Sequence, residues 1–142
     1  MSARSKARQR ALDVLYEADI RSMPAADVLA ATALRRSDEG QAALNEYVSE
    51  IVAGVLEHQP YIDELLGSYS SGWTLDRMPA VDRAILRIGT YELLWRDDIP
   101  DAVAISQAVA LAQELSTDES SSFVNGVLGR LLELKPRLSI DS

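Results

Sequence analysis

The chain contains no cysteine, so it can form neither a disulfide nor a thiolate metal site, and it has no thiol nucleophile. Proline occurs five times and glycine seven times, without a low-complexity tract, so long disordered segments are not expected away from the two ends. No apolar run approaches the roughly 20 residues that a membrane-spanning helix needs. We therefore expect a cytoplasmic globular protein with no membrane anchor.

Histidine is equally scarce, because His58 is the only one. It stands next to Gln59–Pro60 at the predicted end of a helix, where an imidazole interacts favourably with the helix dipole. We interpret it as a helix-end residue in preference to a catalytic base. The sequence also lacks a glycine-rich phosphate loop, a paired-histidine metal motif and a nucleophile elbow. It therefore predicts no enzyme activity, no metal and no cofactor.

Positive charge is in the minority, since 14 Lys and Arg stand against 22 Asp and Glu, a net charge of -8. Four bases nevertheless precede the first acid, Asp13: Arg4, Lys6, Arg8 and Arg10. On a helix they form two i,i+4 pairs beside a stripe of alanines. Like charges at this spacing, and cations at a helix N-terminus, are both unfavourable unless phosphates lie between them. Phosphate binding and a frayed, solvated helix end are equally weighted explanations of this segment.

Apolar residues recur at helical rather than strand spacing along nearly the whole chain. The predicted helices are about 3–22, 25–36, 41–58, 60–69, 80–97, 102–115 and 118–134. Pro60 is expected to open the fourth, and the small-residue stretch 69–73 to link two halves. The sequence therefore predicts an all-α fold, with about seven helices in two small three-helix bundles that share a core. We expect one domain with subdomains about 1–69 and 76–136.

Two of these helices carry start signals. Asp101 is placed to N-cap the helix at 102–115. Ser116 and Glu119 have the spacing of a capping box, which predicts the start of the last helix.

The dipeptide Asn125–Gly126 conflicts with a helix, because it is the most frequent hairpin turn. Its flanking apolar residues recur at three and four, so we place it within the last helix. Gly126 and Gly129 then cost up to about 1 kcal/mol each relative to alanine. We expect close packing of another helix to offset this cost.

Glu92 lies in the middle of an apolar helix face. The other members of that face are Val81, Ile85, Ile88 and Trp95. A carboxylate in such a place must be hydrogen-bonded. We interpret it as a structural strut that accepts backbone N–H groups from a neighbouring helix start, such as the one after Pro100. A general acid or base with a raised pKa is the alternative, for which no second catalytic group is visible.

Four stretches carry a family resemblance: RQRALDVLYEADI, VDRAILRIGTYELLW, DIPDAVAISQAVALAQ and SSSFVNGVLGRLL. In this order and spacing, from Arg4 to about Leu134, they resemble the NusB family of bacterial transcription antitermination factors. The resemblance implies an all-α fold of two three-helix bundles with an added helix. It implies binding of the boxA segment of nascent ribosomal RNA transcripts together with NusE, a small-subunit ribosomal protein that doubles as a transcription factor. It also implies action with RNA polymerase, NusA and NusG. The family includes monomers and dimers, so a homodimer is compatible with it.

The resemblance also assigns residues. It implies RNA contacts by Arg4, Lys6, Arg8, Arg10, Tyr16, Glu119 and Phe123. It places Tyr16 and Asp82 near NusE, and it gives Glu92, Asn125 and Gly126 structural roles. Where the family usually has Ile-Asn-Glu, this chain has Ile105–Ser106–Gln107. Basic side chains would neutralise phosphates without reading sequence, while the ring of Phe123 would stack on a base.

Two other functions are compatible with the same residues. Some RNA methyltransferases carry a NusB-like domain, although a cofactor-binding segment is absent from these 142 residues. A purely structural helical adaptor, whose basic end is incidental, is the second.

Overall fold

The computed structural model describes residues 2–70 and 72–140, and every regular element in them is helical. The α-helices are α1 (Ala3–Arg21), α2 (Ala25–Asp38), α3 (Glu46–Tyr69), α4 (Ala80–Trp95), α5 (Asp101–Leu115) and α6 (Asp118–Leu134). Two short 3-10 helices are η1 (Leu75–Arg77) and η2 (Lys135–Arg137). The predicted all-α class is confirmed, with six α-helices in this part of the chain where about seven were expected.

The chain forms two compact units, Met1–Glu57 and His58–Ser142. The division falls inside α3, before the small-residue link at 69–73 where the sequence predicts the subdomain boundary. The single-domain organisation with two subdomains stays a prediction.

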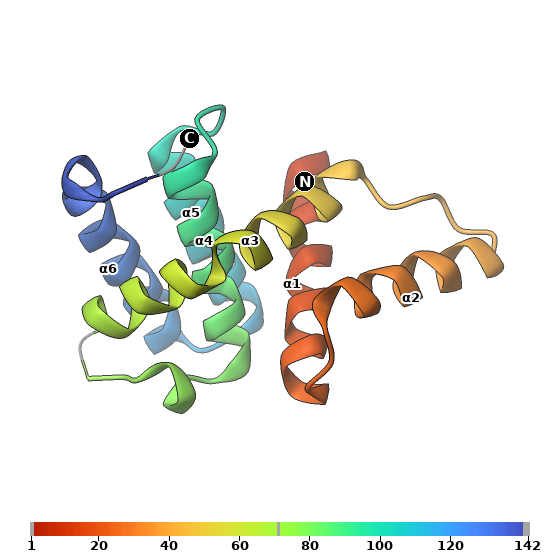
Figure 1. Cartoon of the computed structure of the whole chain (residues 1–142), viewed down its shortest axis with the longest axis horizontal. Coiled ribbons are helices and arrows are strands. Elements are labelled where there is room, and N and C mark those ends of the chain that lie inside the picture. The colour runs from red at the N-terminus through yellow and green to blue at the C-terminus, as the bar shows by residue number, and fades with distance from the viewer. Residues whose placement is uncertain (1, 71, 141–142) are drawn as a thin grey trace. The chain divides into compact units, whose positions relative to one another are not determined.

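In the first unit, α1 and α2 pack against each other (Figure 1). The alanine stripe predicted for α1 is buried: Ala7, Ala11, Val14 and Ala18, with Leu12 and Leu15 beside it. The Ser2 hydroxyl begins the helix by accepting a hydrogen bond from the Ser5 N–H. Ser22 ends it in the left-handed region, with φ of 52°. The basic segment is therefore the ordered first half of a capped helix.

Helix α3 runs through Pro60, where the sequence predicts a break between two helices. This prediction is wrong, as is the helical start at residue 41, because α3 begins at Glu46. A proline inside a helix removes one N–H and leaves the carbonyl four residues earlier without its partner. That residue is Leu56, which is 40% exposed, and Pro60 is exposed as well. Water can therefore serve the freed carbonyl, so the helix continues.

In the second unit, α4, α5 and α6 pack against one another (Figure 1). A Cβ added at Gly89 would lie 2.8 Å from Cδ1 of Leu128 and 3.2 Å from the Ala108 Cβ. Glycine at this one position lets α4 approach both neighbouring helices.

Gly126 and Gly129 do lie within α6, as predicted, but no other helix packs closely against them. Nothing lies within 4 Å of a Cβ at either position. The expectation that close helix packing offsets their cost is wrong, whereas Gly89 does allow a close approach of this kind.

The helix starts differ from the predicted caps by one residue each. Asp101 is the first residue of α5 rather than its N-cap, and its carboxylate accepts an ion-pair bond from Lys135 Nζ at 2.8 Å. Thr117, not Ser116, N-caps α6, and its hydroxyl accepts from the Ser120 N–H at 3.1 Å. The Ser116 hydroxyl instead donates to the Asp82 carboxylate on α4 at 2.7 Å. Ser116 therefore does not form the predicted capping box.

His58 lies within α3, because the helix does not end before Pro60. Its ring stacks on Trp95 with centroids 4.1 Å apart and planes 11° apart, and Tyr91 lies beyond at 6.4 Å. The helix-end interpretation is therefore wrong, and His58 is part of an aromatic stack against α4.

Candidate nucleic-acid interface

The four N-terminal bases do not share one environment. Lys6 and Arg10 are exposed on α1, and with Gln9 and Asp13 they line a shallow depression. Arg4 is also exposed, and its guanidinium carbon lies 4.7 Å from the centre of the Tyr47 ring. Three cations of the predicted set are therefore accessible to an anionic ligand.

Arg8 is the exception, because only 4% of it is exposed. Its guanidinium carbon lies 5.8 Å from the centre of the same Tyr47 ring, and Tyr47 is in the first turn of α3. A cation over an aromatic face is held by the ring quadrupole. The structure thus directs Arg8 inward, and the prediction that it contacts RNA does not agree with this burial.

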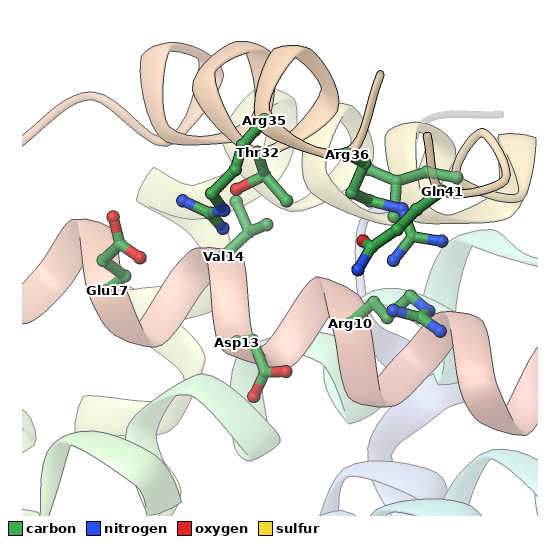
Figure 2. Close-up of a pocket in the computed structure, with 9 residues that line it drawn as sticks. Arg10, Asp13, Val14, Glu17, Thr32, Arg35, Arg36 and Gln41 are labelled. Atoms are coloured by element: carbon green, nitrogen blue, oxygen red, sulfur yellow. The ribbon is translucent and has the colours of Figure 1, made fainter. Parts of the chain in front are cut away.

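The first unit also holds a cleft between α1 and α2, with a volume of about 180 Å³. Figure 2 shows Arg35 and Arg36 extending from α2 toward α1, with Arg10 on the facing helix. The lining residues are Arg10, Asp13, Val14, Glu17, Thr32, Arg35, Arg36, Gln41 and Leu44. Burial raises the pKa of the Asp13 carboxyl, and the charge of Arg10 acts against this.

Tyr16, assigned to the RNA and NusE boundary, is 41% exposed on α1. A large aromatic side chain that remains accessible in this way fits a contact surface.

In the second unit, Phe123 lies beside a second depression of about 490 Å³. Its ring is tilted by 51° against Trp73, with centroids 4.9 Å apart. On the same depression, Arg130 lies 6.0 Å from the centre of the Tyr69 ring. Glu119, one turn before Phe123, is exposed. Aromatic faces, a cation and a carboxylate are thus available around one half-buried ring.

Asp82 is fully buried, at 0% exposure. Its two carboxylate oxygens each accept a hydroxyl at 2.7 Å, one from Ser116 and one from Ser120. These bonds fasten the start of α6 to α4. The predicted position of Asp82 at the NusE surface does not agree with this burial, which gives the residue a structural role.

The three residues with predicted structural roles differ in burial. Glu92 is 1% exposed, which confirms the predicted burial of a carboxylate in this helix face. Asn125 and Gly126 are exposed on α6, so neither contributes to the core. The departure Ser106–Gln107 lies on α5, where the Ser106 hydroxyl donates to the Val103 carbonyl at 3.2 Å.

Several candidate residues were missed from the sequence. Tyr69 and Trp73 are the first and last residues of the predicted linker, and Arg130 follows Phe123 at i,i+7 on one face of α6. Arg35 and Arg36 adjoin in the sequence and end a helix with few buried residues. A pair of arginines on a poorly buried helix was the available signal.

Neither a metal cluster nor a membrane span emerges from this geometry. No group of three or more His, Asp or Glu side chains that could hold a metal ion occurs among residues 2–70 and 72–140. Within the same residues, no helix is long and apolar enough to cross a membrane.

These features define a class: an all-α protein with cationic and aromatic side chains on its helix surfaces. Comparison with known proteins gives the family. The NusB family profile matches residues 5–133. This chain belongs to the NusB family.

Relatives at high identity support the same assignment. The transcription antitermination protein NusB of Arthrobacter sp. (strain FB24) is 62% identical over 138 residues, covering 97% of this chain and 98% of that protein. The protein of the same name from Pseudarthrobacter chlorophenolicus is 61% identical over 138 residues, with the same coverage of 97% and 98%.

Solved structures share the fold. NusB of T. maritima is similar with a TM-score of 0.80 and 30% identity, covering 97% of this chain and 99% of that one. A chain from the structure of antitermination factors NusB and NusE in complex with double-stranded RNA has a TM-score of 0.80 and 24% identity, covering 94% and 98%. At this identity the second likeness concerns the fold alone.

Proposed function

We propose that this protein is a transcription antitermination factor that binds boxA-type single-stranded RNA in nascent ribosomal RNA transcripts, together with NusE. The observation that carries the proposal is the exposed basic surface of α1, formed by Arg4, Lys6 and Arg10 on a chain of net charge -8. An acidic protein repels nucleic acid unless a local patch overcomes its field. The relatives' name, transcription antitermination protein NusB, supports the same function.

The two units contribute different chemistry to this proposal. The α1 cations neutralise backbone phosphates, which positions an RNA without reading its sequence. Single-stranded RNA is read by stacking and by base-edge contacts. Phe123 offers the stacking face, supported by Trp73, and the exposed Glu119 carboxylate can accept a base amino group.

NusE is the proposed protein partner, with Tyr16 at its boundary with the RNA. A basic ribosomal protein is attracted by the acidic remainder of this chain, which also discourages indiscriminate RNA binding. We place the complex on the elongating RNA polymerase, with NusA and NusG, where it suppresses premature termination in the cytoplasm. A regulatory role of this kind requires no catalytic centre. Self-association in the absence of RNA is compatible with it.

Salt dependence of RNA binding tests the proposal. A boxA-type RNA and a scrambled RNA are titrated with the full chain at several salt concentrations, with and without NusE. Three exposed bases predict a log–log slope of about −2 from α1 alone, at about 0.7 per phosphate contact. NusE should tighten binding to the boxA-type RNA more than binding to the scrambled one. A slope near zero removes the phosphate assignment.

Variants then locate the surface. Lys6→Ala and Arg10→Ala should each lower the slope by about 0.7. Arg137→Ala is the matched control, because this arginine is exposed and lies in η2, far along the chain from the proposed surface. Equal loss in all three variants would indicate general charge attraction instead of a site.

A further inference from the structure

The cleft between α1 and α2 carries a concentration of arginine that the family resemblance does not assign. Arg35 and Arg36 extend into it from the last turn of α2, and Arg10 faces them from α1 (Figure 2). Residues 2–44 contain seven of the 14 Lys and Arg but only six of the 22 Asp and Glu. This part of an acidic chain is therefore cationic on balance.

Arg36 is held in place without being neutralised. Its Nε and Nη2 both donate to the Ala42 carbonyl, at 3.0 and 2.7 Å. A carbonyl carries no net charge, so the guanidinium keeps its full positive charge and its remaining N–H groups. A fixed guanidinium loses less side-chain entropy when it binds a further anion. Arg36 is thus preorganised for a second acceptor.

The acidic side chains of the cleft do not cancel these cations. Glu17 is paired with Arg21 outside the cleft, at 2.9 Å. Within residues 2–70 and 72–140, neither Arg35 nor Arg36 forms an ion pair with a carboxylate. Asp13 is the remaining acid of the cleft; burial raises the pKa of its carboxyl, which disfavours the charged form, and the positive charge of Arg10 partly opposes the rise.

The cleft is continuous with the basic surface of α1. The shallow depression at Lys6 and Gln9 also includes Arg10 and Asp13, and these last two residues line the cleft as well. A chain of phosphates that follows the accessible cations of α1 therefore reaches Arg10 and meets Arg35 and Arg36 next.

We propose that the α1–α2 cleft is a second phosphate-binding site, in which Arg35 and Arg36 hold backbone phosphates of the same RNA after it passes Arg10. The site extends the RNA path from α1 onto α2, and it adds affinity without sequence preference, because phosphate contacts carry no base information. Guanidinium groups suit this task because their planar donors match phosphate oxygens in pairs. The inference rests on the proposed RNA-binding function.

The test uses the full chain in anisotropy titrations with boxA-type and scrambled single-stranded RNA across a range of salt. Arg35→Gln and Arg36→Gln remove one charge each, and glutamine at 36 retains a donor for the Ala42 carbonyl. Each variant should lower the salt slope by about 0.7 and weaken both RNAs by the same factor. The wild-type slope should then be about −3.5, steeper than α1 alone provides. Arg137→Gln is the charge-matched control and should change the slope much less.

Asp13→Asn supplies a change in the opposite direction. Removal of the carboxylate that lines both depressions should tighten both RNAs several-fold. Glu114→Gln, an exposed acid on α5, removes the same charge elsewhere and should have little effect.

The outcomes separate the two proposals. Unchanged slopes in Arg35→Gln and Arg36→Gln, with reduced slopes in Lys6→Ala and Arg10→Ala, overturn the cleft and leave the proposed function standing. A second outcome is that Arg35→Gln and Arg36→Gln keep the wild-type salt slopes for RNA but no longer bind NusE when RNA is left out. This outcome identifies the cleft as a protein-binding surface and also overturns the inference. Absence of RNA binding by the wild-type chain overturns both. Thermal melting checks that each variant is folded. If Arg36→Gln does not fold, the salt slope of Arg35→Gln alone tests the proposed cleft site.

Discussion

The carboxylate of Asp82 and the hydroxyl of Ser120 are joined by a buried hydrogen bond of 2.7 Å between α4 and the first turn of α6. The Ser116 hydroxyl occupies the other carboxylate oxygen at the same distance of 2.7 Å. Ser120 also carries the N–H that Thr117 caps. One acid therefore fastens both the capping segment and the helix that presents Glu119 and Phe123.

Asp82→Asn should destabilise the protein. The amide retains one acceptor oxygen but presents an N–H₂ group where Asp82 accepts a hydroxyl, so at least one charge-assisted bond is lost. Such bonds contribute about 1.5–3 kcal/mol each. The melting temperature should fall by several degrees. Asp118→Asn is the matched control, because Asp118 is exposed in the first turn of the same helix. If Asp82→Asn instead loses NusE binding while its melting temperature is unchanged, Asp82 belongs to the partner surface and the structural role is contradicted.

Gly89→Ala should destabilise by overpacking. The new methyl group would lie 2.8 Å from Cδ1 of Leu128, closer than real Cβ contacts allow. Forcing an extra methyl group into a well-packed core costs about 1–3 kcal/mol. Urea unfolding should report a lower midpoint with an unchanged m-value.

Gly129→Ala provides the opposite expectation within the same fold. It lies in α6 with open space around the Cβ position, so alanine gains helix propensity without a clash. The gain should be up to about 1 kcal/mol. A destabilised Gly129→Ala, measured by urea unfolding, would contradict the expectation that helix propensity decides the effect at this position.

The periodicity of apolar residues was sufficient for the helices but not for their ends. The Asn125–Gly126 dipeptide was correctly placed in a helix, because the spacing around it outweighs a two-residue turn signal. The prediction at Pro60 was wrong, because the sequence does not reveal that Leu56 and Pro60 lie on an exposed side of the helix. The error then moved His58 to a helix end, although its stacking on Trp95 depends on a partner distant in the sequence.

The candidate site shows the same limit. The exposed cations of α1 follow directly from sequence spacing, whereas the inward turn of Arg8 depends on Tyr47 on another helix. Likewise, the burial of Asp82 depends on hydroxyls from residues 116 and 120. Side-chain direction is set by tertiary neighbours that a local pattern does not contain.

Phe123→Ala and Arg10→Ala should separate by mechanism. Loss of the aromatic ring should reduce the ratio between boxA-type and scrambled RNA affinities, because stacking on exposed bases contributes about 1–3 kcal/mol. Loss of the cation should weaken both RNAs by the same factor and leave the ratio unchanged. Titrations of both RNAs with both variants check this. If neither substitution changes binding, the RNA surface lies elsewhere on the protein.

Asp13→Asn should increase stability in a pH-dependent manner. Burial raises the pKa of the Asp13 carboxyl above 3.8, while Arg10 partly opposes the rise. The folded state therefore binds this proton more firmly than the unfolded state, so ionisation of Asp13 costs stability as the pH rises through its folded pKa. The gain from asparagine should be fully present above the folded pKa and should vanish below 3.8. Urea unfolding of both proteins across acidic pH measures it, and a pH-independent difference would contradict the cause.

Glu92→Gln distinguishes a structural carboxylate from a functional one. Glu92 is 1% exposed on α4, and α5 begins after Pro100 without a side-chain cap of its own. The predicted strut accepts backbone N–H groups at such a start. Glutamine keeps the shape but replaces a charged acceptor with a neutral amide and a misplaced donor.

The expected loss in the free energy of unfolding is about 1.5–3 kcal/mol, which corresponds to a melting temperature several degrees lower. Glu114→Gln, an exposed acid on α5, should melt as the wild type does. RNA affinity measured well below the melting temperature should not change, because the substitution leaves the cations of α1 and the ring of Phe123 in place. Unchanged melting combined with abolished RNA binding would instead make Glu92 a functional carboxylate.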